Sequence, residues 1–110
     1  MDGSEEDPDH PVLDAPFRWT LVEFTYRRDM ADWQQSHIDL VLERDGVRKR
    51  LRFFDPREVE LDRGVPNSSG LYIKDVSRRQ MEGIGVRVGS FEPDWCVPHF
   101  WAASVVEVAE

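Results

Sequence analysis

Two alternating runs joined by Asp45-Gly46 constrain the fold of this chain more than any other stretch. An Asp-Gly pair between such runs is the strongest local signal for a β-hairpin, because a type I′ turn needs positive φ at both central residues. The stretch from Ser36 to Phe54 therefore predicts two antiparallel strands. Counting outward from the turn, with Arg44 opposite Val47, gives their register.

The predicted register places apolar residues on one face of this hairpin and charged residues on the other. The pairs on the apolar face are Ile38 with Phe53, Leu40 with Leu51, and Leu42 with Lys49. The pairs on the charged face are Asp39 with Arg52, Val41 with Arg50, and Glu43 with Arg48. A half-buried antiparallel pair has this alternation, and facing opposite charges support the pairing.

Short runs rich in aromatic and β-branched residues recur along the rest of the chain. We expect further strands within 17–26, 58–62, 71–76, 84–91 and 99–108. A change of parity at Leu21-Val22 indicates a β-bulge or a strand buried on both faces. Ser77 is the expected N-cap of a single helical turn closed at Gly83. The predicted fold is mainly β, an antiparallel β-sandwich or partly open barrel of about seven strands with at most one or two short helical turns.

Acidic residues are concentrated at the start of the chain, which has 110 residues and a formal net charge of −8. Six acids and no Lys or Arg occur before residue 17: Asp2, Glu5, Glu6, Asp7, Asp9 and Asp14. We expect 1–15 to be an acidic disordered tail and 16–110 to be a single β-rich domain. The single cysteine suits a reducing compartment, and no signal peptide or membrane-span pattern is present. We therefore expect a cytoplasmic protein without membrane contact.

The segment around Cys96 and His99 is the first candidate for chemistry. A Cys-x-x-His pair can bind one metal ion or form a nucleophile. A closed zinc site needs four ligands, however, and the other histidines are His10 and His37. A lone cysteine beside Trp95 is more often a buried apolar side chain. We expect no cofactor and no bound metal, and keep a metal or small-ligand site at Cys96 and His99 as the alternative.

A stripe of basic residues on the hairpin is the second candidate. Its members are Arg44, Arg48, Lys49, Arg50 and Arg52. A basic ribbon beside aromatic residues can bind single-stranded RNA or a phosphate. Pairing with Asp39 and Glu43 across the hairpin is a simpler role, and the acidic net charge disfavours nonspecific nucleic-acid binding. Nucleic-acid binding is therefore the less favoured alternative.

Trp101 stands out among the four tryptophans. If Phe100 and Ala102 point into the core, Trp101 lies on the other face of its strand, where a second layer or a partner covers it. We therefore predict a partner-binding surface that includes Asp94, Trp95 and Trp101. The sequence has no paired carboxylates, glycine-rich phosphate loop or Ser/His/Asp order, and we expect no enzymatic activity.

The stretch 17–108 contains, in this order, the short segments LRFF, VEL, LYIKDVSRRQMEG, VRV and FWAASVVEV. In this pattern of hydrophobic segments the chain resembles small, mostly β bacterial proteins of unknown function, among them immunity proteins that neutralise toxins of polymorphic systems. The resemblance implies a class of function and no particular site residue. With the acidic charge, which can steer association with a basic toxin, it predicts a non-enzymatic protein-binding domain such as an immunity-like inhibitor. Edge strands can pair across a two-fold axis, so a homodimer stays open.

Overall fold

The computed structural model describes residues 8–32, 35–60, 71–79, 83–90 and 99–109. These residues form eight strands in two antiparallel sheets, with two 3-10 turns, η2 (Pro16–Arg18) and η4 (Ser77–Arg79). The strands are β1 (Thr20–Arg27), β2 (His37–Arg44), β3 (Val47–Phe54), β4 (Arg57–Glu60), β5 (Leu71–Asp75), β6 (Val86–Ser90), β7 (His99–Ala102) and β8 (Ser104–Val108). The predicted mainly β, antiparallel and open architecture is confirmed.

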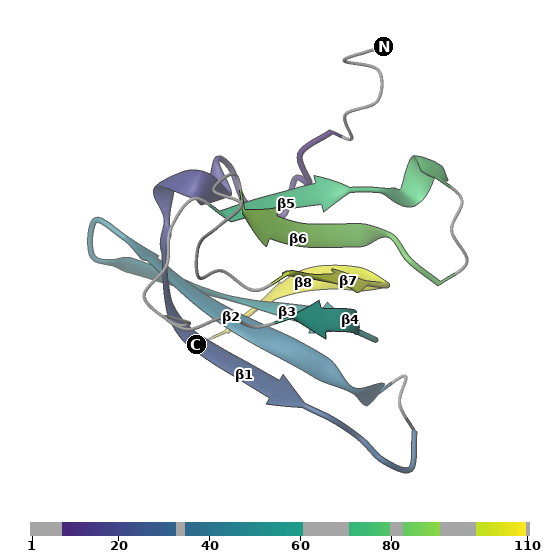
Figure 1. Ribbon diagram of the computed structural model, residues 1–110. Coiled ribbons are helices and arrows are strands. Elements are labelled where there is room, and N and C mark those ends of the chain that lie inside the picture. The colour runs from purple at the N-terminus through teal and green to yellow at the C-terminus, as the bar shows by residue number, and fades with distance from the viewer. Residues whose placement is uncertain (1–7, 33–34, 61–70, 80–82, 91–98, 110) are drawn as a thin grey trace.

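The strands divide between two four-stranded sheets. Sheet 1 has the order β1-β2-β3-β8, and sheet 2 has the order β4-β7-β6-β5. In Figure 1 the β5–β6 pair lies at the top of the view and the β1–β2 pair at the bottom, with β7 and β8 between them. The chain passes from sheet 1 to sheet 2 after β3 and returns between β7 and β8.

The central hairpin has the predicted register at every pair from Arg44 opposite Val47 to Ile38 opposite Phe53. Asp45 and Gly46 have φ values of 53° and 81°, which a type I′ turn requires. The apolar face of the hairpin is buried against sheet 2. Its fully buried members are Ile38, Leu40, Leu42, Leu51 and Phe53.

An edge-to-face aromatic pair joins the two layers of the core. The ring centroids of Phe53 on β3 and Phe100 on β7 lie 5.1 Å apart, with an interplanar angle of 87°. Such pairs contribute about 0.5–1.5 kcal/mol beyond the area that they bury. On β1 the predicted bulge is confirmed, because Leu21 pairs with Leu42 while Glu23 pairs with Val41.

The stretch 99–108, expected as one strand, is two strands in different sheets. β7 buries Phe100 and Ala102, whereas β8 buries Val105, so the inward parity changes at Ala103. Phe54 is the last residue of β3, and its carbonyl oxygen accepts a hydrogen bond from the amide of Ala103 at 2.8 Å. The apolar residues on both parities of 99–108 therefore reflect a change of sheet. Because this stretch forms two strands instead of one, the number of strands is eight rather than about seven.

Residues Pro8 to His10 pair with the edge of β5 and Leu13 packs in the core, which corrects the expectation of a disordered tail up to residue 15. The amide of His10 donates to the carbonyl oxygen of Ile73 at 2.9 Å, and the amide of Asp75 donates to that of Pro8 at 2.8 Å. Leu13 is buried in the core. Backbone pairing to an otherwise free strand edge outweighs the polar composition of this segment. Residues 1–7 lie outside the described part of the chain.

The charged face of sheet 1 is centred on the carboxylate of Asp39, which is almost fully buried. Arg52 donates to both of its oxygens, from Nε at 2.9 Å and from Nη2 at 3.0 Å. Arg50 donates from Nη1 at 3.1 Å and also reaches Glu23 on β1 at 3.4 Å. Burial alone would raise the pKa of Asp39, but the hydrogen bonds from Arg52 and Arg50, with the charges of Arg52 and His37, together lower it.

We predict that Asp39→Asn lowers the free energy of unfolding at neutral pH by about 1.5–3 kcal/mol, the range for hydrogen bonds to charged groups. Because the folded pKa lies below the unfolded value of about 3.9, the Asp39 contribution is present above that pH and is lost as the pH falls through the folded pKa. Urea denaturation at several acidic pH values should therefore show a weaker pH dependence in the variant. Equal slopes in both proteins would contradict this assignment.

Gly85 lies where the corner between β7 and β8 approaches the segment before β6. A Cβ at this position would lie 2.7 Å from the carbonyl oxygen of Ala103, closer than real contacts allow. The amide of Gly85 also donates to Ala102 at 2.9 Å, and its carbonyl accepts from Val76 at 2.9 Å. The close approach of the two backbones therefore requires glycine.

We predict that Gly85→Ala lowers the free energy of unfolding by about 1–3 kcal/mol, because one backbone segment must move outward. The displacement should also lengthen the hydrogen bond from Val76. Amide hydrogen exchange at Val76 should therefore accelerate more than exchange at Leu40, in the centre of sheet 1. Unchanged denaturation and exchange would show that the corner accommodates a methyl group.

Candidate functional site

The predicted partner-binding residues fall in two groups in the structure. Asp94 and Trp95, together with Cys96 of the alternative metal site, lie outside the described residues. Trp101 and His99 lie on β7, where both are half-buried and alternate with the buried Phe100 and Ala102. Trp101 therefore faces away from the core, as the sequence predicted.

Arg87 of β6 packs beside Trp101 on the outer face of sheet 2. The two residues are register partners in the β6–β7 pair. The guanidinium carbon of Arg87 lies 5.0 Å from the centroid of the Trp101 ring and 5.8 Å from that of Tyr72 on β5. Both distances fall within the range of cation–π attraction. Three neighbouring strands thus contribute one aromatic and basic cluster.

Gly89 determines where the Tyr72 ring lies. Tyr72 and Gly89 are register partners in the β5–β6 pair. A Cβ added to Gly89 would overlap the phenol oxygen and the adjoining ring carbon of Tyr72. The Tyr72 ring therefore crosses the space that a side chain at position 89 would fill, and its centroid lies within cation–π distance of Arg87.

Two carboxylates from β4 border the same cluster. A bulge in β4 places Glu60 opposite His99 and Arg57 opposite Trp101, with Glu58 between them at a φ of 53°. Neither Glu58 nor Glu60 has a hydrogen bond or an ion pair with any residue that the structure describes. A shallow pocket of about 140 Å³ separates these strands. Its lining residues are Glu58, Glu60, Arg87, Val88, His99, Phe100 and Trp101.

We name this area the Trp101 surface and define it by Glu58, Glu60, Tyr72, Arg87, His99 and Trp101. Sequence reasoning found Trp101 and missed most of its neighbours. The alternation VRV at 86–88 does indicate that Arg87 points outward, because the flanking valines are apolar. It could not indicate which strands lie beside Arg87, since that depends on pairing between strands that are distant in the sequence.

Among the described residues, no group of three or more His, Cys, Asp or Glu side chains is placed to hold a metal ion. His99 lies beside Trp101, whereas Cys96 falls outside the described ranges. The proposed ligand pair is therefore not placed, and it stays a prediction.

The basic stripe of the hairpin is compensated by acidic side chains. The predicted pairs are present, with Arg48 3.1 Å from Glu43 and Arg52 2.9 Å from Asp39. The remaining ion pairs are Arg44 with Asp45 at 3.5 Å, Lys49 with Glu107 at 3.5 Å, and Arg50 with Asp39 at 3.1 Å and Glu23 at 3.4 Å. Every cation of the stripe thus has a carboxylate within ion-pair distance, which accounts for the stripe without a nucleic acid.

Comparison with protein-family models, curated proteins and solved structures finds no match to this chain. The resemblance to immunity proteins therefore rests on sequence cadence alone and stays a prediction. In the part of the chain that the structure describes, no helix is long and apolar enough to cross a membrane.

We predict that Trp101→Leu moves the Arg87 side-chain proton resonances downfield, because the ring-current shift of the indole is lost. The cost in unfolding free energy should be near that of a partly exposed cation–π contact, about 0.5–1 kcal/mol. Two-dimensional NMR of the Arg87 Nε–Hε group and urea denaturation are the measurements. Phe17→Leu is the control, since Phe17 contacts Arg18 outside this surface. Unchanged Arg87 resonances would contradict the stacked arrangement.

Proposed function

We propose that this chain is a non-enzymatic protein-binding domain of the cytoplasm, and that it binds a basic protein through the Trp101 surface. The observation that carries the proposal is an outward-facing tryptophan, stacked with Arg87 and bordered by two carboxylates that no described residue neutralises. The proposal assigns no chemical reaction to this surface.

The aromatic part of this surface has the composition of a binding hot spot. Trp, Tyr and Arg are the residues most enriched at positions that dominate the free energy of protein binding. Trp101, Tyr72 and Arg87 already contact one another in the free chain. A partner therefore meets side chains whose rotamers are largely set, which reduces the entropy lost on binding.

Charge supports a basic partner. Glu58 and Glu60 have no ion pair with a described residue, whereas the neighbouring cation Arg57 is already paired with Asp55, so the two carboxylates add negative charge beside Arg87. The whole chain carries −8, much of it before residue 17. Complementary charge raises association rates and disfavours acidic competitors. An immunity-like inhibitor of a basic toxin is one form of this function, in keeping with the resemblance seen in the sequence.

The test is site-specific photo-crosslinking in the cells that produce this protein. A benzophenone amino acid at position 101 should capture one predominant protein with a basic isoelectric point. The same group at Val47, which is exposed at the hairpin turn, should not capture it. With the partner purified, Trp101→Ala should weaken binding by at least about tenfold, equal to about 1.4 kcal/mol, while Val47→Ala leaves it unchanged.

Three results would overturn the proposal: capture of no specific protein, capture of an acidic protein, or an affinity that Trp101→Ala leaves unchanged. Thermal unfolding of each variant must first show a folded domain, because Trp101 is half-buried and its removal costs some stability.

A further inference from the structure

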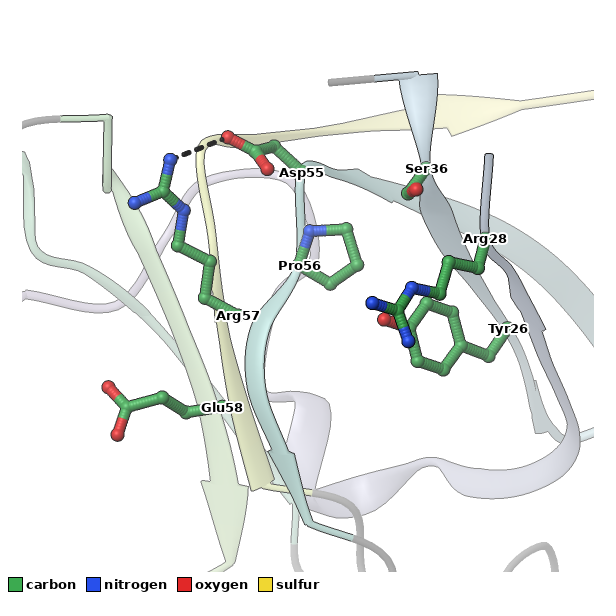
Figure 2. Close-up of a pocket in the computed structure, with 7 residues that line it drawn as sticks. All are labelled: Tyr26, Arg28, Ser36, Asp55, Pro56, Arg57 and Glu58. Carbon is green, nitrogen blue, oxygen red and sulfur yellow. Dashed lines mark hydrogen bonds and ion pairs between the residues drawn. The ribbon is translucent and has the colours of Figure 1, made fainter. Parts of the chain in front are cut away.

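A cleft opens where the ends of the two sheets diverge, between β1 and the start of β4. It has a volume of about 620 Å³, within the range of small-molecule sites. Figure 2 shows the residues that line it: Tyr26, Arg28, Ser36, Asp55, Pro56, Arg57 and Glu58. β1 and β4 are edge strands of their sheets, so no described strand fills the space between them.

The walls of the cleft present the flat apolar surfaces of Tyr26 and Pro56 and two arginines, Arg28 and Arg57, of which Arg57 is paired with Asp55. In Figure 2 the Pro56 ring faces Tyr26 and Arg28, whereas the side chains of Arg57 and Glu58 extend to the opposite side of the strand. Tyr26 is 40% exposed, although it pairs with the buried Ile38 and so lies on the inner face of sheet 1. A planar ligand can therefore insert between Tyr26 and Pro56.

Arg28 supplies an unbalanced positive charge. It has no hydrogen bond or ion pair with any residue in the described ranges. Asp55 is already occupied, since Nη2 of Arg57 lies 3.0 Å from its Oδ2. The Glu58 carboxylate points away from Tyr26 and Arg28. An anion placed beside Arg28 thus meets one guanidinium without a competing carboxylate on the same wall.

The buried Ser36 ties the two walls together. Its hydroxyl oxygen accepts a hydrogen bond from the amide of Asp29 at 2.8 Å, next to Arg28. Its carbonyl oxygen accepts from the amide of Asp55 at 3.0 Å, next to Pro56. Asp55 has a φ of 53°, a left-handed conformation that is costly for a non-glycine residue and turns the chain sharply into β4. The cleft is therefore held open by hydrogen bonds of Ser36 that exist without a ligand.

We propose that this cleft binds a small organic carboxylate with a planar apolar body. The carboxylate accepts the paired N–H donors of Arg28, and the planar body lies between Tyr26 and Pro56. A single guanidinium matches a carboxylate in charge and in its two-pronged geometry. A phosphate dianion would call for more donors than this wall offers. The site lies beside the Trp101 surface and does not depend on the function proposed for that surface.

The experiment is isothermal titration calorimetry of the full chain with 2-naphthoate, its neutral amide 2-naphthamide, and 2-naphthyl phosphate. We expect saturable binding of 2-naphthoate with a dissociation constant below about 1 mM, and binding of the other two at least about tenfold weaker. Arg28→Gln and Tyr26→Leu should each weaken 2-naphthoate binding at least about tenfold. Arg27→Gln is the matched control, because Arg27 is also exposed and directly precedes Arg28, at the end of β1, but does not line the cleft.

Each contrary result overturns the proposal. Absence of saturation by 2-naphthoate removes the site, and equal binding of 2-naphthamide removes the role of charge. Tighter binding of 2-naphthyl phosphate replaces the carboxylate class with a phosphate class. Equal losses in Arg28→Gln and Arg27→Gln would show a general charge effect. Both arginines are exposed, so we expect both variants to fold, and thermal unfolding checks this. A failure here leaves the crosslinking result at Trp101 unaffected.

Discussion

The hydrogen bond from the amide of Ala103 to the carbonyl oxygen of Phe54 marks the point on which both sheets depend. The chain leaves sheet 1 directly after Phe54 and re-enters it directly after Ala103. Both crossings therefore meet at one place, which is closed further by the contact of Gly85 with Ala103. This junction determines how far the two sheets can separate, and Phe53 and Phe100 pack edge to face beside it.

The cleft and the Trp101 surface are consequences of that junction. The sharp turn at Asp55 directs β4 away from β1 and leaves the cleft between them, while the break at Ala103 ends β7 just after Trp101. β4 is common to both sites, since its edge borders the cleft and its carboxylates border Trp101. The bulge at Glu58 separates the two roles within four residues. A short irregular strand thus borders both the cleft and the Trp101 surface.

Sequence reasoning succeeded where contacts are local. The hairpin register followed from Asp45-Gly46 because a two-residue turn leaves one way to pair the flanking strands. The outward position of Trp101 followed from alternation with Phe100. It failed for Pro8–Ala15, whose polar composition conceals backbone pairing to β5, and for 99–108, where one apolar run crosses between sheets. Neither feature has a local signal, because each depends on a strand edge supplied by distant residues.

Alternation, turn chemistry and charge spacing suffice to define a mainly β chain, its central hairpin and the pairing of Arg52 with Asp39. These features act between residues that a short turn holds together, so the pairing of these residues can be predicted from the sequence. The cation–π cluster of Tyr72, Arg87 and Trp101 and the cleft beside Arg28 arise only when the sheets assemble. These sites join strands that are far apart in the sequence, and long-range packing selects which strands become neighbours.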